Sequence, residues 1–254
     1  MARSRSQSLP RRTCKTAATC GEDGILALAR HAFGYGTARG VIRGIGDDAA
    51  VLEPPAAGML ELLTTDTLVA GTHFTPAQPP RAVGGKAMAV NISDVAAMGG
   101  VPRHAVVSLA VPAKTPIRYL RELMAGMQRA AEAFGIAVVG GDIVGSPVLA
   151  ITVTMTGQVE PECLCCRSGA KPGHFIVVTG PLGGAVRSGK HLRFTPRLAE
   201  ARWLVRHARP SAMMDLSDGS STNSILASSF RATSAARSAS TPMMTPLVLN
   251  TMGG

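Results

Sequence analysis

Seven of the chain's eight aspartates stand at the junctions of expected strands and helices, next to glycine, serine or threonine. They are Asp47, Asp48, Asp66, Asp94, Asp142, Asp215 and Asp218. Taken one at a time, aspartates at such positions are typical of solvated turns and caps. Several of them follow an apolar stretch, and open α/β sheets usually bind ligands at the carboxyl ends of their strands. The set therefore supports two interpretations, isolated turn residues or one shared site.

A shared site of carboxylates requires a compensating cation. The stretch GIGDDAAVLEP (44–54) places two carboxylates side by side, and ionised carboxylates brought together raise each other's pKa. Mg²⁺ accepts carboxylate, hydroxyl and water oxygens and usually shares them with phosphate groups. Thr64 and Thr65, directly before Asp66, supply such hydroxyl groups. We therefore favour a magnesium–polyphosphate site over isolated turn residues.

A second phosphate-binding pattern competes with this site. Gly184, Gly189, Lys190 and His191 give the spacing G-x-x-x-x-G-K-H after the apolar run FIVVTG. A P-loop needs Ser or Thr after the lysine to hold Mg²⁺, and its glycine loop follows the strand directly. His191 fails the first requirement and the intervening PLGG fails the second, so the aspartate site is preferred.

Apolar periodicity alternates between helical and strand spacing along the chain, which predicts a mixed α/β (α+β) protein. Asn91 and Asp94 share one face of an otherwise apolar helix, and Trp203 is expected in the core on the last one. The expected helices cover 22–33, 84–100, 116–135 and 196–208, and the expected strands cover 49–52, 59–63, 104–112, 136–142, 147–160 and 175–180.

Composition divides the chain into four segments. Residues 1–20 hold five Lys/Arg and no acidic residue, and are predicted to be a disordered basic extension. Residues 21–160 are predicted to form an N-terminal metal- and nucleotide-binding domain, and 161–219 the start of a C-terminal domain. Residues 220–254 contain no Asp or Glu and no sustained period, which predicts a low-complexity tail.

Charge and hydropathy argue against two function classes. The net charge is +10, but residues 21–218 hold 19 basic and 16 acidic side chains, so the excess lies mainly in the two ends. No basic face interleaved with aromatic residues is visible, so nucleic-acid binding is not expected. No apolar run approaches the ~20 residues of a transmembrane helix, so a cytoplasmic protein without membrane contact is expected. Cys14, Cys20, Cys163, Cys165 and Cys166 form no paired CxxC and are expected to be free thiols.

Six motifs, in this order, resemble those of the thiamine-monophosphate kinases, a branch of the aminoimidazole ribonucleotide synthetase superfamily. They are GIGDDAAVL, LLTTDTLVAGTHF, KAMAVNISDVAAMGG, VVGGDIVGSP, RSGAKPGHFIVVTG and MMDLSDG. The resemblance covers residues 21 to about 219, and TTDTLVAGTHF with NISDVAAMGG points to the thiamine branch. It implies transfer of the γ-phosphoryl group of ATP to thiamine monophosphate, with Mg²⁺. It also implies an N-terminal α/β domain whose strands form a barrel across a homodimer, and a C-terminal α/β domain that closes over the nucleotide.

The family's site residues carry over motif by motif. The implied magnesium ligands are Asp48, Thr64, Thr65, Asp66, Asp94, Asp142 and Asp215, with Asp218 for a further ion. The implied ATP contacts are Gly141, Asp142, Arg167 and Ser217, and His73 is implied to contact thiamine monophosphate. Asp47 is interpreted as a turn or supporting residue, and Lys86, Arg103 and Lys171 as ordinary surface charges. No general base is assigned, because the acceptor phosphate is already ionised at neutral pH.

The chain departs from the family after DLSDG (215–219). The GGEDYE-like segment and the aromatic residue that family members carry further on do not appear in the sequence. A truncated or frameshifted chain with an incomplete C-terminal domain is therefore expected. Three functions stay open, namely the kinase, an impaired remnant that dimerises and binds Mg-ATP, and another ATP-dependent enzyme of the superfamily.

Overall fold

The computed structural model describes residues 15–34, 40–45, 49–180, 184–216 and 247–251. The chain forms two compact units. The first comprises Met1–Pro54, Thr65–Met88 and Arg103–Met155, and the second comprises Pro55–Thr64, Ala89–Pro102 and Thr156–Gly254. Because the chain crosses between the units several times, three of the long strands and one helix contribute residues to both.

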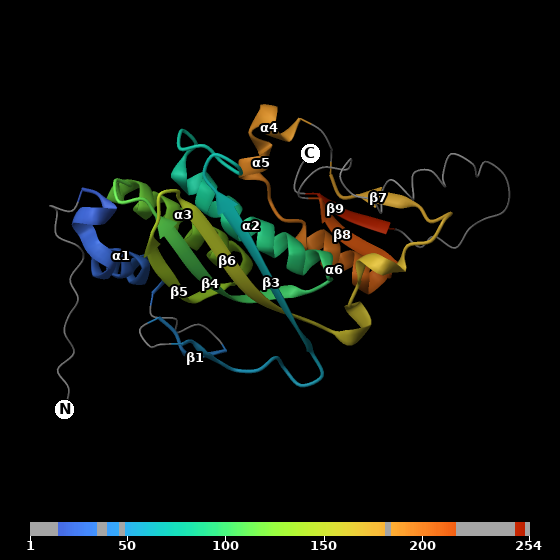
Figure 1. Cartoon of the computed structure of the whole chain (residues 1–254). Helices are drawn as coiled ribbons and strands as arrows, with labels where there is room; N and C mark the ends of the chain where they lie inside the picture. The colour runs from blue at the N-terminus through green and yellow to red at the C-terminus, as the bar shows by residue number, and fades with distance from the viewer. Residues whose placement is uncertain (1–14, 35–39, 46–48, 181–183, 217–246, 252–254) are drawn as a thin grey trace. The chain divides into compact units, whose positions relative to one another are not determined.

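Helices and strands alternate through the described residues, which confirms the mixed α/β class (Figure 1). The helices are α1 (Ala17–Phe33), α2 (Pro80–Ala97), α3 (Ile117–Phe134), α4 (Ala185–Ser188), α5 (Lys190–Arg193) and α6 (Leu198–His207). The strands are β1 (Val41–Arg43), β2 (Val51–Leu52), β3 (Leu60–Val69), β4 (Val101–Val111), β5 (Ala137–Gly145), β6 (Ala150–Val159), β7 (Ile176–Val178), β8 (Ala212–Leu216) and β9 (Leu247–Thr251). No helix of the described ranges is long and apolar enough to cross a bilayer.

The largest sheet has the strand order β3-β6-β4-β5. β4 and β5 run parallel, whereas the hydroxyl pairs Thr65–Thr154 (2.9 Å) and Thr67–Thr152 (2.8 Å) show that β3 and β6 are antiparallel. β6 alternates buried and half-buried residues along its whole length, as expected for a strand with one face on the core. This sheet holds five of the predicted site residues, namely Thr64, Thr65 and Asp66 on β3 and Gly141 and Asp142 on β5.

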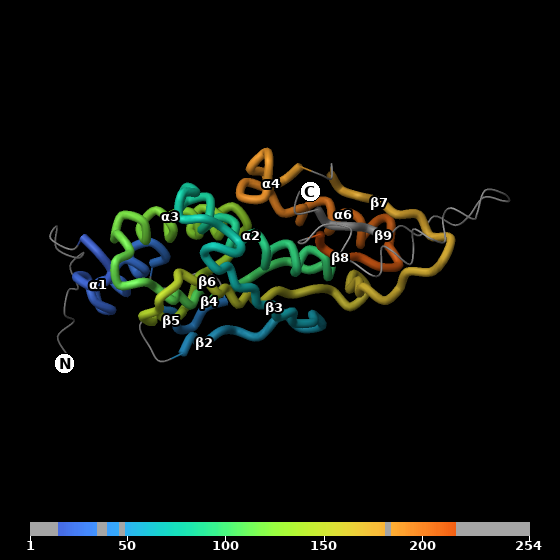
Figure 2. The backbone as a smooth tube through the Cα atoms, turned by 45° about the horizontal axis from the view of Figure 1, so that its top comes forward, coloured from blue at the N-terminus to red at the C-terminus, as the bar shows by residue number. Residues whose placement is uncertain are grey.

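In the first unit, α1 and α3 pack against each other and against β5 (Figure 2). α1 begins at Ala17, five residues earlier than predicted, because Thr16 and Thr19 form a capping box. The helix is kinked at Gly21, where φ is +68°. α3 buries Leu120, Leu123 and Met127 and is capped after Phe134 by Gly135.

In the second unit, β7, β9 and β8 form a parallel sheet with β9 in the centre. β9 lies in the segment for which the sequence predicts no regular element, and β8 was not predicted either. α6 contributes Ala201 and Val205 to a buried cluster that also holds Cys163, Cys165 and Met213.

The prediction that Trp203 belongs to the core is wrong. Its side chain is 58% exposed, because α6 turns Ala201 and Val205 to the core and Trp203 to the opposite face. There the indole ring stacks on His207, with ring centroids 5.0 Å apart.

Candidate functional site

The second unit contains a cavity of about 360 Å³ lined by three of the predicted site residues. Thr64 is the last residue of β3 that belongs to this unit. Asp94 lies on α2, and Arg167 begins the one-turn helix η2 (Arg167–Gly169). Leu62, Val95 and Met213 supply apolar wall. The cavity thus combines a carboxylate, a hydroxyl and a guanidinium group.

Asp94 is the central carboxylate of this cavity. The Thr64 hydroxyl donates a hydrogen bond of 2.7 Å to Asp94 Oδ2. Burial raises the pKa of Asp94 above its ordinary value, while this hydrogen bond and the positive charge of Arg167 act in the opposite direction. An ionised Asp94 is therefore incompletely compensated by the protein, which is the condition under which a bound cation stabilises a carboxylate.

Asp215 is the second carboxylate on this side of the molecule. It lies near the end of β8 with only 5% of its surface exposed. Arg167 Nη2 lies 3.3 Å from Asp215 Oδ1, and the Arg167 side chain remains 59% exposed. Arg167 is thereby tied to the buried carboxylate at one end and open to solvent at the other.

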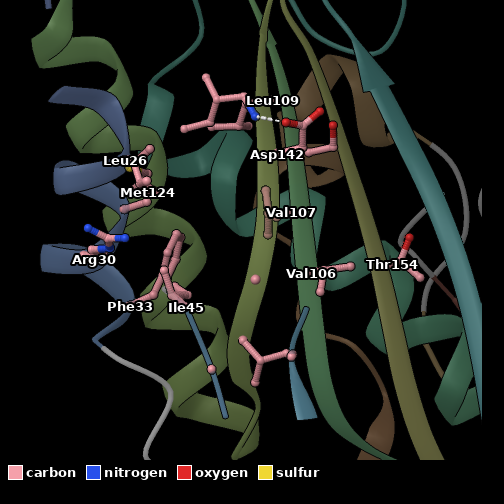
Figure 3. A pocket seen from close by; sticks show the side chains of 18 of the residues that line it. Leu26, Arg30, Phe33, Ile45, Val106, Val107, Leu109, Met124, Asp142 and Thr154 are labelled. Atoms are coloured by element: carbon pink, nitrogen blue, oxygen red, sulfur yellow. Dashed lines mark hydrogen bonds between the residues drawn. The ribbon is translucent and has the colours of Figure 1, made fainter. Parts of the chain in front are cut away.

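The first unit contains a larger cavity, of about 960 Å³, beside the predicted pair Gly141–Asp142. Figure 3 shows Leu26, Arg30 and Phe33 of α1 on one side of it, together with Met124 of α3. Asp142 lies on β5, where its Oδ1 accepts a hydrogen bond from the Ile143 backbone N–H at 2.9 Å. The walls are largely apolar, and charged groups from α1 and β5 lie among them.

Gly141 has a steric reason for its identity. A Cβ atom at this position would lie 1.9 Å from the carbonyl oxygen of Val107 on the neighbouring strand β4. Only glycine allows β5 to pass β4 this closely beside Asp142.

Thr65 and Asp66 follow Thr64 on β3 and belong to the first unit. The Thr65 hydroxyl lies 2.9 Å from that of Thr154 and 3.2 Å from the carbonyl oxygen of Val153. Thr65 is exposed and Asp66 is half-buried. Side chains alternate across a strand, so Thr64 and Asp66 point to the same face of the sheet and Thr65 to the other.

His73 lies in the exposed loop that follows β3. The ring Nδ1 of His73 accepts a hydrogen bond of 3.0 Å from the Val69 backbone N–H. The backbone N–H of His73 donates to the Val69 carbonyl oxygen at 2.9 Å. In the neutral ring the hydrogen is then on Nε2, which is the atom left to donate to a ligand.

The described site residues fall into two groups. Thr64, Asp94, Arg167 and Asp215 belong to the second unit, and Thr65, Asp66, His73, Gly141 and Asp142 belong to the first. Within the described ranges, no three His, Cys, Asp or Glu side chains are close enough to hold a metal ion together. Asp47, Asp48, Ser217 and Asp218 lie outside the described residues.

The sequence reasoning missed several residues that line the two cavities. Leu26, Arg30 and Phe33 recur at helical spacing in the sequence, which predicts a helix face but does not show what covers it.

Cys166 lines the cavity in the second unit next to Arg167. Cys20, Cys163, Cys165 and Cys166 are free thiols, and Cys14 lies outside the described residues.

The P-loop-like segment has a different local structure from a phosphate-binding loop. The residues between Gly184 and Gly189 form the single turn α4, and Lys190 begins a second turn, α5. A P-loop instead wraps its backbone N–H groups around the phosphates before one long helix begins. This geometry supports the preference for the aspartates.

Comparison with known proteins agrees with the motif order. Residues 46–159 match the family described as AIR synthase related protein, N-terminal domain. The Thiamine-monophosphate kinase of Rhodopirellula baltica is 38% identical over 184 residues, which cover 69% of this chain and 57% of that protein. The resemblance to thiamine-monophosphate kinases is confirmed.

Solved structures give the same result. The Thiamine-monophosphate kinase of Stenotrophomonas maltophilia K279a is 33% identical, with a TM-score of 0.60, and the match covers 66% of this chain and 60% of that one. AaThiL, solved in complex with AMPPCP and TMP, is 30% identical with a TM-score of 0.54, over 76% of this chain and 64% of that one. The chain spans less than two thirds of each of these thiamine-monophosphate kinase relatives.

Proposed function

We propose that this chain is a thiamine-monophosphate kinase, which transfers the γ-phosphoryl group of ATP to thiamine monophosphate and releases ADP and thiamine diphosphate. The observation that carries the proposal is the grouping of Thr64, Asp94 and Arg167 around one cavity, with Arg167 also paired to Asp215. These residue types were assigned to metal and nucleotide from the sequence motifs alone. The relative AaThiL, whose solved complex holds AMPPCP and TMP, supports the same pair of substrates.

The proposed phosphoryl transfer needs no strong general base, but it needs extensive compensation of negative charge. The acceptor oxygen of thiamine monophosphate is ionised at neutral pH, so it needs no proton removed before it attacks. The main barrier is repulsion between two polyanions that must meet in line. Mg²⁺, when bound, would neutralise this charge and align the phosphoryl groups.

The donor groups fit a hard divalent cation. Asp94 is a half-buried carboxylate next to a hydroxyl, and its pKa is raised by burial. Carboxylate and hydroxyl oxygens are the protein ligands that Mg²⁺ takes. We assign the magnesium ions to Asp48, Thr64, Thr65, Asp66, Asp94, Asp142, Asp215 and Asp218.

The remaining assignments concern the two substrates. Arg167 would bind the phosphates of ATP through its exposed guanidinium end, while its pairing with Asp215 fixes its direction. Gly141, Asp142 and Ser217 would complete the ATP contacts. The largely apolar cavity beside Gly141 and Asp142 fits the nucleoside part of ATP. His73 would donate from Nε2 to thiamine monophosphate.

We also propose that the protein is a homodimer whose N-terminal strands form a barrel across the interface, with a C-terminal domain that begins near residue 161. Exposed apolar side chains on the strands support this proposal, including Leu63 at 72% and Val144 at 45% exposure. Light scattering after gel filtration would show a mass near twice 26.2 kDa. A monomeric mass at micromolar concentration would overturn the dimer.

The test of the kinase is ADP release on addition of thiamine monophosphate to the full chain with Mg-ATP. The reaction should be abolished in Asp66→Asn and preserved in Glu61→Gln, an exposed carboxylate on the same strand. Turnover with a different phosphate or carboxylate acceptor, but not with thiamine monophosphate, would favour another enzyme of the superfamily. Thermal stabilisation by Mg-ATP without turnover of any acceptor would favour the non-catalytic remnant.

A further inference from the structure

The loop that carries His73 is closely fixed to the end of β3. The Ala70 backbone N–H donates to the Leu149 carbonyl oxygen at 2.9 Å, and that of Gly71 donates to Phe74 at 2.7 Å. Phe74 is only 3% exposed and anchors the far end of the loop. The positions of the His73 ring and carbonyl group are therefore set by several backbone contacts.

Lys86 on α2 is attached to this loop. Its Nζ donates a hydrogen bond of 3.0 Å to the carbonyl oxygen of His73. The side chain is half-buried, and burial lowers its pKa below the usual value. Among the residues that the structure describes, no carboxylate lies within 4.0 Å of this ammonium group. The surface-charge interpretation drawn from the sequence does not account for this environment.

A partly desolvated cation without an anionic partner is a costly arrangement. An ammonium group has three N–H donors, and the His73 carbonyl takes one of them. An anion that accepts from the other two would offset the desolvation of the cation. The loop to which Lys86 is hydrogen-bonded carries His73, the predicted contact to thiamine monophosphate.

We propose that Lys86 is a further substrate-binding residue, whose ammonium group binds the phosphate of thiamine monophosphate beside the His73 loop. This inference rests on the proposed kinase function. In this assignment Lys86 contributes a positive charge to substrate binding, and His73 contributes a directed hydrogen bond. Neither group transfers a proton in this arrangement.

Two substitutions separate the charge of Lys86 from its structural hydrogen bond. Lys86→Gln removes the charge and keeps an N–H donor for the His73 carbonyl, whereas Lys86→Arg keeps the charge. Loss of one charge-assisted hydrogen bond should weaken binding by roughly 10- to 150-fold. Lys114→Gln, the same substitution at an exposed lysine of the first unit, is the matched control.

Calorimetric titration of the full chain with thiamine monophosphate, and separately with the Mg complex of a non-hydrolysable ATP analogue, tests the inference. Lys86→Gln should bind thiamine monophosphate at least 10-fold more weakly and the ATP analogue unchanged, and Lys86→Arg should recover most of the loss. In turnover, the KM for thiamine monophosphate should rise while that for ATP stays constant.

Three results with the variants would overturn the inference, and one with the wild type would overturn the kinase on which it rests. Unchanged binding of thiamine monophosphate by Lys86→Gln would exclude a role for the charge. An equal loss for both ligands, or no recovery with Lys86→Arg, would show that Lys86 acts only on folding or loop structure. A wild-type chain that binds the ATP analogue but not thiamine monophosphate would overturn the proposed kinase itself, and the two failures are distinguishable in the same titrations.

Discussion

Arg167 lies 3.3 Å from Asp215, so the group assigned to the nucleotide is the counter-ion of a buried carboxylate assigned to a metal ion. Asp215 is 5% exposed and would be costly as an uncompensated charge, whereas the Arg167 side chain reaches solvent. A cation bound at Asp215 would supply the positive charge that Arg167 otherwise provides. Binding of the metal ion and binding of the nucleotide phosphates are therefore linked through this pair.

Arg167→Gln tests this link. Without Mg²⁺ the variant should be about 1 kcal/mol less stable than the wild type, a small loss because Arg167 is largely exposed. Added Mg²⁺ should restore the lost stability, so that the variant and the wild type become equally stable. The affinity of the variant for Mg-ATP should nevertheless be lower by roughly 10-fold or more. Thermal melts with Mg²⁺ alone and with Mg-ATP measure the two effects. Arg187→Gln, on the one-turn helix α4, is the control. An equal affinity of the variant and the wild type for Mg-ATP would contradict the assignment of Arg167.

Asp94→Asn tests the carboxylate next to Thr64. Burial raises the pKa of Asp94, so the folded state favours its protonated form, and its contribution to stability is lost as pH rises through the folded pKa. Asparagine keeps an oxygen acceptor for the Thr64 hydroxyl without the charge. We therefore expect the variant, without metal at pH 7.5, to melt slightly above the wild type, and this advantage to shrink toward pH 4.

The same variant should lose the metal-dependent effect. Mg-ATP should raise the melting temperature of the wild type and leave that of Asp94→Asn nearly unchanged. Asp23→Asn, at an exposed position of α1, is the control. A variant that is stabilised by Mg-ATP as much as the wild type would remove Asp94 from the metal site.

Local signals explain which elements were predictable from the sequence. The helix expected over 116–135 is observed as Ile117–Phe134, because Pro116 is extended and Gly135 adopts the left-handed conformation at its end. β8 was missed because all five of its residues are buried and its sequence AMMDL has no alternating pattern. The partner of β8 is β9, which begins 31 residues after β8 ends. A pairing over that separation leaves no local pattern.

The candidate site was predictable in its residue types and not in its contacts. Thr64 and Asp94 were both assigned as magnesium ligands, and the structure joins them by a hydrogen bond across 30 residues of sequence. Nothing in the sequence showed that Arg167 pairs with Asp215 or that Lys86 reaches the carbonyl group of His73. Both contacts depend on tertiary packing, which the motifs that begin with Lys86 and Arg167 do not reveal.

Glu160→Gln tests the ion network that joins β6 to α6. Glu160 Oε1 accepts from Arg202 Nη2 at 2.7 Å and from Arg206 Nη2 at 3.0 Å, and Arg202 also donates to the Gly99 carbonyl oxygen. The hydrogen bond from Arg202 is the main reason that the pKa of Glu160 falls from 4.5 to about 2. The depressed pKa adds stability that is complete above pH 4.5 and is lost as pH falls toward 2.

The variant should therefore be about 1–3 kcal/mol less stable than the wild type at pH 7 and nearly equal to it near pH 2. Urea denaturation across this pH range measures the difference. Glu162→Gln, an exposed carboxylate two residues later, should show no such dependence. A destabilisation that stays constant with pH would mean that the network acts through packing and not through charge.

Gly141→Ala tests whether the close approach of β5 to β4 shapes the cavity of the first unit. The added Cβ would meet the Val107 carbonyl oxygen at 1.9 Å, so the strands must separate or β5 must shift. Such overpacking typically costs about 1–3 kcal/mol. Because Asp142 is the next residue, the shift should also weaken binding of the Mg complex of a non-hydrolysable ATP analogue.

Gly145→Ala on the same strand is the matched control, since a Cβ there has no atom within 4 Å. The two variants should therefore differ in both stability and nucleotide affinity. If Gly141→Ala binds the analogue as tightly as Gly145→Ala does, the backbone at this position does not form part of the nucleotide site.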